Sequence, residues 1–163
     1  ILFLKFNAML REYDVVIADT SCFILLDKIG EIQLLQKIFS SIITTQIIAS
    51  EFGKPLPEWV KIVPVENKPY QNILELEVDA GEASAFALSV EYNKPLLIID
   101  DLKARKLADK LLLNYTGTLG ILLKAKELNI LPSVKPFLIK IQSTNFRFSQ
   151  EVFDEILAIA QEK

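Results

Sequence analysis

The feature that most constrains the fold is a run of four apolar residues, 96–99, followed at once by Asp100 and Asp101. A strand that is apolar on both faces is typical of a parallel sheet covered by helices on each side. Such sheets bind ligands beyond the carboxyl ends of their strands. One aspartate is expected to cap the next helix. The second indicates a functional site, because adjacent carboxylates repel each other unless a cation lies near them.

Alternating patterns continue along the rest of the chain. A short apolar strand at residues 15–18 ends at Asp19, and further strand patterns fall at residues 42–44, 62–63 and 114–116. Helical patterns fall between and after the strands. One follows residues 19–21 and stops at Gly30, one opens at residues 79–82 and packs as far as Val90, and one buries residues between Ala104 and Leu111. The others fall at residues 31–39, 46–52, 70–78, from the turn at 117–120 to about 129, 134–141 and 148–161. Strands that alternate with helices predict an α/β fold with a central parallel sheet of four to five strands and helices on both sides.

The length of 163 residues predicts a single domain over 1–163, with a core at about 14–131 and C-terminal helices at about 133–163. No apolar run approaches the roughly 20 residues that span a bilayer, so no membrane contact is expected. Cys22 is the only cysteine, which excludes a disulfide framework and a thiolate zinc cluster and fits a reducing, cytoplasmic location. The absence of histidine excludes Ser-His-Asp and Cys-His catalysis.

Five carboxylates fall at strand ends or on the helices beside them: Asp19, Glu51, Glu82, Asp100 and Asp101. Oxygen ligands without histidine or cysteine favour a hard ion such as Mg²⁺ or Mn²⁺. Each position also has a purely structural interpretation. Asp19, Thr20 or Ser21 can cap a helix, Glu51 can be a surface charge, and Glu82 stands three residues after Asp79, the spacing of a capping box.

The charges are distributed unevenly. Residues 1–101 contain 8 Lys/Arg and 15 Asp/Glu, whereas residues 102–163 contain 10 and 6. An acidic centre beside a basic second half can hold a metal ion and still attract a phosphate backbone, although solvated helix faces account for most of these charges. The nearest candidates for phosphate contacts are Lys103, Arg105 and Lys106.

Five motifs in order resemble those of the PIN-domain family. They are Asp-Thr-Ser after the first strand, a Glu about thirty residues later, Gly-Glu-x-x-Ala, Ile-Ile-Asp-Asp-x-x-Ala-Arg and Gly-Thr-Leu-Gly. The chain is similar to the DUF3368-type, PIN-like branch of prokaryotic proteins related to VapC toxins, from residue 15 to about residue 163. The resemblance implies a three-layer α/β/α fold and an Mg²⁺- or Mn²⁺-dependent ribonuclease.

The resemblance also implies roles for individual residues. The catalytic acids would be Asp19, Glu51, Glu82 (where the family usually has Asp) and Asp101. The metal ligands would be drawn from Asp19, Glu82, Asp100 and Asp101, with either Asp100 or Asp101 as the acid after the fourth strand. Groups that orient the ligands or water would be Thr20, Ser21 and Thr118.

The function expected from this resemblance is an endoribonuclease that hydrolyses RNA phosphodiester bonds, as the toxin-type half of a toxin–antitoxin pair. A small antitoxin protein and a homodimer are the implied partners. The alternative is a catalytically impaired PIN-like domain that binds RNA or a protein partner without cleaving, and the Glu at the third acidic position is the feature that favours it.

Overall fold

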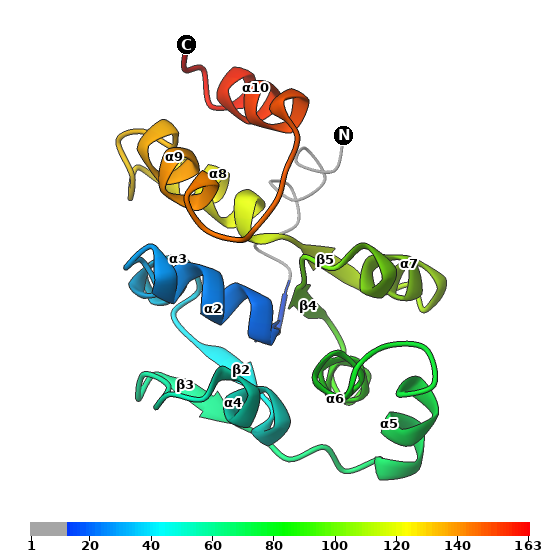
Figure 1. Cartoon of the computed structure of the whole chain (residues 1–163). Helices are drawn as coiled ribbons and strands as arrows, with labels where there is room; N and C mark the ends of the chain where they lie inside the picture. The colour runs from blue at the N-terminus through cyan, green and yellow to red at the C-terminus, as the bar shows by residue number, and fades with distance from the viewer. Residues whose placement is uncertain (1–12) are drawn as a thin grey trace.

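A five-stranded sheet, all of whose strands are parallel, forms the centre of the computed structural model, which describes residues 13–163 (Figure 1). The sheet order is β3-β2-β1-β4-β5. The strands are β1 (Val15–Ala18), β2 (Ile42–Thr44), β3 (Val60–Ile62), β4 (Pro95–Ile98) and β5 (Asn114–Thr116). The predicted α/β class and the parallel sheet of four to five strands are therefore confirmed.

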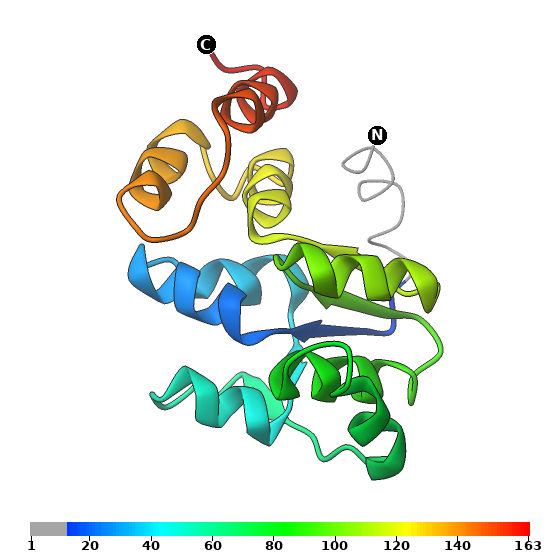
Figure 2. The same ribbon diagram turned by 45° about the vertical axis from the view of Figure 1, so that its right-hand side comes forward.

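Helices connect the strands and flank the sheet, as the alternating pattern predicts. They are α2 (Thr20–Lys28), α3 (Gln33–Phe39), α4 (Gln46–Phe52), α5 (Lys68–Leu74), α6 (Ala80–Ser89), α7 (Leu102–Lys110), α8 (Thr118–Glu127), α9 (Lys135–Gln142) and α10 (Gln150–Ile159). In the two views, α8, α9 and α10 lie together at one end of the molecule, and α5 and α6 lie together at the other (Figures 1 and 2). No helix among the described residues is long and apolar enough to cross a membrane.

Several elements differ in extent from the sequence prediction, two of them clearly. The helix expected at residues 70–78 is α5, which ends at Leu74 and starts earlier because the side chain of Asn67 accepts a hydrogen bond from the Tyr70 N–H at 3.1 Å. Pro69 occupies the first turn of α5, where a missing N–H costs no helical hydrogen bond. The edge strand expected at residues 62–63 is β3, which begins two residues earlier and pairs with β2.

The order of the strands reverses between β1 and β4. From β1 the chain adds β2 and then β3 on one side, and it returns to add β4 and β5 on the other side of β1. All four residues of β4 are buried, in keeping with the apolar run from which the sheet is predicted. In doubly wound sheets the crevice at such a switch point is where ligands bind, beyond the carboxyl ends of the two strands.

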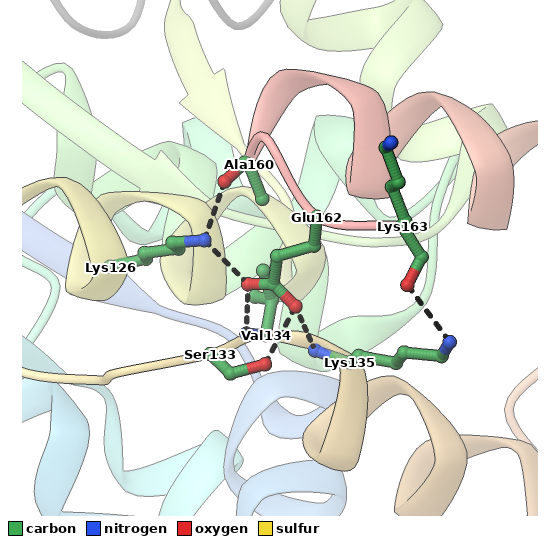
Figure 3. Close-up of polar contacts among 7 residues, drawn as sticks. All are labelled: Lys126, Ser133, Val134, Lys135, Ala160, Glu162 and Lys163. Atoms are coloured by element: carbon green, nitrogen blue, oxygen red, sulfur yellow. Dashed lines mark hydrogen bonds and ion pairs between the residues drawn. The ribbon is translucent and has the colours of Figure 1, made fainter.

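The C-terminal helices are held together by the carboxylate of Glu162 (Figure 3). It accepts hydrogen bonds from Lys126 Nζ at 2.7 Å, Ser133 Oγ at 2.6 Å and the backbone N–H groups of Val134 and Lys135 at 2.7 and 3.1 Å. No side chain near the start of α9 caps that helix, so Glu162 supplies its N-terminal acceptor from a distance in sequence. Burial alone would raise the pKa of Glu162, but these hydrogen bonds outweigh it and lower the pKa to about 2.

Candidate functional site

Asp19 lies directly beyond the end of β1 at the switch point of the sheet. Its backbone N–H donates to Ile98 O of β4 at 3.1 Å, which holds the two strand ends together. Asp19 occupies the N-cap position of α2, but its side chain makes no capping hydrogen bond. The residue is nevertheless only 5% exposed. Capping of α2 therefore does not account for the burial of this carboxylate.

The two consecutive aspartates have separate roles. Asp101 caps α7, since its Oδ1 accepts from the Ala104 N–H at 2.8 Å, so the expectation that one of the pair is a cap is confirmed. Asp100 is the more buried, with its side chain 8% exposed. Its two oxygens accept from the backbone N–H of Thr118 at 2.8 Å and from Thr118 Oγ1 at 2.6 Å. Thr118 therefore orients Asp100.

Arg105 is fixed beside Asp100. Its Nε donates to Ile99 O at 3.1 Å, and its Nη2 lies 3.8 Å from Asp100 Oδ1. Gly117 makes this arrangement possible, because a Cβ at that position would collide with the Arg105 guanidinium and lie 2.8 Å from Asp100 Oδ1. Of the three cations expected to contact RNA, Arg105 is thus held by the protein itself, whereas Lys103 and Lys106 are exposed on α7.

Glu51 is brought to the site by α4. Its Oε2 accepts from Thr20 Oγ1 at 2.5 Å, so Thr20 contacts one of the predicted acids. The Glu51 carboxylate lies against α6 at Gly81, where a Cβ would collide with it. A residue that looks like an ordinary surface charge in the sequence therefore stands beside the first turn of α6, the turn that carries Glu82.

Glu82 forms the capping box that its spacing from Asp79 predicts. The Glu82 N–H donates to Asp79 Oδ1 at 2.8 Å, and Glu82 Oε2 accepts from the Asp79 N–H at 3.3 Å. Glu82 as a residue is only 7% exposed, which is unusual for a capping glutamate at the protein surface. Capping therefore accounts for one oxygen of Glu82 but not for the burial of its carboxylate.

The charges of these acids raise one another's pKa values. The pKa of Asp19 is raised to about 7, first by burial and then by the charges of Asp79, Glu51 and Asp100, against a backbone hydrogen bond from Thr20 that lowers it. The pKa of Glu82 is also raised to about 7, by burial and by the charges of Asp79, Asp19 and Asp101.

Burial likewise raises the pKa of Asp100, while Thr118 and Arg105 oppose that shift. All five predicted carboxylates thus act on one region. Asp79 is an acid that the sequence analysis missed as a member of this cluster, since its spacing indicates a cap and nothing more. One signal in the sequence could have found it. The helix α6 leads into a buried parallel strand, so the start of α6 must lie at the carboxyl edge of the sheet, next to Asp19.

The donor set fits a hard divalent cation. It consists of carboxylates and nearby hydroxyls, the ligands that Mg²⁺ and Mn²⁺ prefer. Ser21 adds an independent observation, because its Oγ is buried and has no hydrogen-bond partner within residues 13–163. Within the same residues, however, no three acidic or cysteine side chains are already gathered closely enough to hold an ion. The residues fit the cation in chemistry, and their oxygens would have to converge to bind it.

Comparison with known proteins identifies the family. No curated protein and no solved structure matches the chain significantly. A family model described as DUF3368, a PIN domain, matches residues 15–162, which include every strand and helix described above. The chain therefore belongs to the PIN-domain family, whose members are generally nucleases.

Proposed function

We propose that this protein is a divalent-metal-dependent endoribonuclease that hydrolyses RNA phosphodiester bonds. The observation that carries the proposal is the position of two buried carboxylates, Asp19 and Asp100, directly after β1 and β4 at the switch point of the sheet, where the charge of Asp100 adds to the raised pKa of Asp19. Membership of the PIN family supports a nuclease in general. The basic surface on α7 beside the acids favours a polyanionic substrate.

We assign the following roles to the residues around the acidic site. Asp19, Glu82 and Asp100 would hold Mg²⁺ or Mn²⁺, with Asp101 and Glu51 adding negative charge at the edge of the site. Bound there, the ion would supply an activated water and stabilise negative charge on the phosphate. Thr118 orients Asp100 and Thr20 orients Glu51 through their hydroxyls. Lys103 and Lys106 would contact the flanking phosphates.

The proposal is tested by RNA cleavage and by metal-dependent stability in the same preparations. Purified protein is incubated with structured and unstructured RNAs in Mn²⁺ and in chelator, and its melting temperature is followed as Mn²⁺ is raised to millimolar concentrations. Binding to the folded state alone adds about 2.7 kcal/mol of stability at a concentration 100 times the Kd. We expect Mn²⁺-dependent cleavage and a rising melting temperature, both abolished by Asp19→Asn.

Asp14→Asn is the matched control. Asp14 precedes the same strand β1 at its opposite end and is exposed, so this variant removes the same charge away from the site. It should behave like the parent in both measurements. A melting temperature that does not respond to Mn²⁺ in the parent, together with equal RNA integrity in Mn²⁺ and chelator, would refute the proposal.

The second candidate is a PIN domain that binds RNA or a protein without cleaving. Two observations favour it: Glu82 has one oxygen engaged in the capping box, and the described residues offer no preassembled group of three acids. Under this alternative, RNA binds equally well in Mn²⁺ and in chelator and stays intact in both.

We also propose a toxin-type role, with a small antitoxin and a homodimer as partners. Exposed apolar side chains that a partner would cover are present beside α5, where Ile73 is 61% and Leu76 is 82% exposed. Light scattering of the purified protein measures the dimer, and growth of cells that express it from an inducible promoter measures toxicity. A monomer at all protein concentrations would contradict the proposed homodimer, and unimpaired growth would contradict the proposed toxicity.

A further inference from the structure

A cavity of about 390 Å³ opens beside the acidic site. Its walls come from the start of α7, the turn from β5 into α8, and the loop that leads into α10. Figure 1 shows that loop, in orange, passing next to the start of α8. The cavity shares Asp100 and Gly117 with the acidic site, so a molecule held here would lie next to the buried carboxylates. Its size is in the range of small-molecule binding pockets.

Aromatic rings line this cavity in fixed positions. Phe148 is stacked on Phe153 with the ring planes 2° apart and the centroids 6.2 Å apart, and the centroid of the Phe146 ring lies 6.2 Å from that of Phe148. Tyr115 also lines the cavity, and its ring centroid lies 5.5 Å from the Arg105 guanidinium carbon. Phe146, Phe148 and Tyr115 line the cavity and are each partly exposed, whereas Phe153 supports Phe148 from outside the lining. Flat, pre-positioned aromatic surfaces are what nucleobases stack upon.

The cations of the cavity are arginines. The described residues contain two arginines, Arg105 and Arg147, and both line the cavity, whereas no lysine in that part of the chain does. Arg147 is exposed, donates to Thr144 O at 2.7 Å and makes no ion pair within residues 13–163. The carboxylates in the lining are Asp100, which Thr118 and Arg105 satisfy, and the exposed Glu155. An arginine guanidinium stacks on bases and binds phosphate through two parallel hydrogen bonds.

We propose that this cavity binds one unpaired nucleotide of the RNA, next to the phosphate that faces the acidic site. Its base would stack on Phe148 and Tyr115, and its phosphate would contact Arg147. Unpaired bases are the parts of RNA that aromatic and arginine side chains recognise, which makes a single-stranded segment the substrate class. That the ligand is RNA rests on the proposed nuclease function. The inference adds the site at which the protein binds one base of that RNA.

The test measures binding without cleavage. Fluorescence anisotropy follows a labelled single-stranded oligoribonucleotide and a base-free ribose-phosphate oligomer of the same length, both in chelator. Phe148→Leu removes the aromatic face but keeps an apolar side chain. We expect it to weaken binding of the oligoribonucleotide about 5- to 150-fold and to leave binding of the base-free oligomer unchanged. Phe137→Leu, a change of another partly buried phenylalanine on α9 outside the cavity, is the matched control.

A second variant keeps the test decisive if Phe148→Leu unfolds. Arg147→Gln changes an exposed side chain and should weaken binding of both oligomers and lower the salt dependence by about one phosphate contact. The control is Lys61→Gln, an exposed cation on β3 at the far edge of the sheet. Parent-like RNA binding by both folded cavity variants would overturn the inference, and so would equal weakening of the two oligomers by Phe148→Leu.

The outcomes separate this inference from the proposed function. If the cavity variants lose RNA binding and the parent never cleaves RNA in Mn²⁺, the nucleotide site stands and the nuclease proposal fails. If the parent cleaves and the cavity variants bind and cleave as the parent does, the nuclease proposal stands and the nucleotide site fails.

Discussion

At the residue scale, Glu82 combines a structural role with a position in the acidic site. Its Oε2 completes the capping box, while burial and the neighbouring acids raise its pKa to about 7. A carboxylate whose pKa is higher in the folded state than in the unfolded chain destabilises the fold as the pH rises through that interval. Here the loss begins above the ordinary value of 4.5 and is complete above about 7.

Glu82→Gln separates these roles. An amide oxygen still accepts the hydrogen bond from Asp79 N–H, so the cap should survive, but the anionic oxygen is lost. In chelator we expect the variant to equal the parent in unfolding free energy at pH 4 and to exceed it at pH 8, because the buried charge has gone. Mn²⁺ affinity should fall at least about tenfold. Denaturant unfolding at both pH values measures the difference in stability, and a Mn²⁺ titration measures the affinity. A variant that cleaves RNA at the parent's rate in limiting Mn²⁺ would show that Glu82 is only a cap.

Gly81→Ala tests the placement of Glu51. The new Cβ would occupy the space of the Glu51 carboxylate, which is the movable end of a side chain and can swing away. The unfolding free energy should therefore change by no more than about 1 kcal/mol, since alanine also favours the helix. Mn²⁺ affinity should fall about tenfold or more. The control is the same change in a Glu51→Gln background, where it should have little further effect; equal losses in both backgrounds would place the cause elsewhere.

At the element scale, α7 joins the acidic site to the basic surface. Asp101 caps its first turn, Arg105 is anchored towards Asp100, and Lys103 and Lys106 face solvent.

Reversing Lys103 and Lys106 to Glu should weaken RNA binding and flatten the dependence of log K on log salt by about two phosphate contacts. Reversal of Lys37 and Lys61, both exposed on other elements, is the control for net charge. An unchanged salt slope would mean that RNA approaches over another surface.

At the scale of the whole molecule, Glu162 connects α8, the start of α9 and the chain after α10 (Figure 3). Its pKa is lowered to about 2 from 4.5, so its contribution to stability is fully present above 4.5 and is lost as the pH falls through 2. At pH 7, Glu162→Gln should lower the unfolding free energy by about 1.5–3 kcal/mol, the range for a hydrogen bond to a charged group.

The deficit of Glu162→Gln should shrink between pH 4.5 and pH 2, where the parent loses the same charge. Urea unfolding of parent and variant across that range measures it. Glu151→Gln, a change of an exposed acid in the first turn of α10, should not reproduce the loss. A constant difference at all pH values would show that shape, not charge, makes the Glu162 contact.

The local elements follow from the sequence because their causes are local. The period of apolar residues and nearby turn signals predict α4 at residues 46–52 and β5 at residues 114–116, and both are found there. The capping box of Asp79 and Glu82 is likewise a contact across three residues. The end of a buried strand also marks Asp19 and Asp100 as candidates, because side chains at strand ends share one edge of a parallel sheet.

Contacts between distant residues are decided only by the tertiary structure. Asp101 caps a helix while its neighbour Asp100 turns towards Thr118, eighteen residues away, and no periodicity distinguishes the two. Asp79 gains an electrostatic role, and Arg105, Phe148 and Arg147 share one cavity, because the sheet brings β1 beside β4 and packs α10 near α8. Sequence patterns reflect hydrogen bonds and burial over a few residues, so they predict helices, strands and caps. Whether a site can bind a cation or a base depends on which distant elements pack together, and only the tertiary structure decides that.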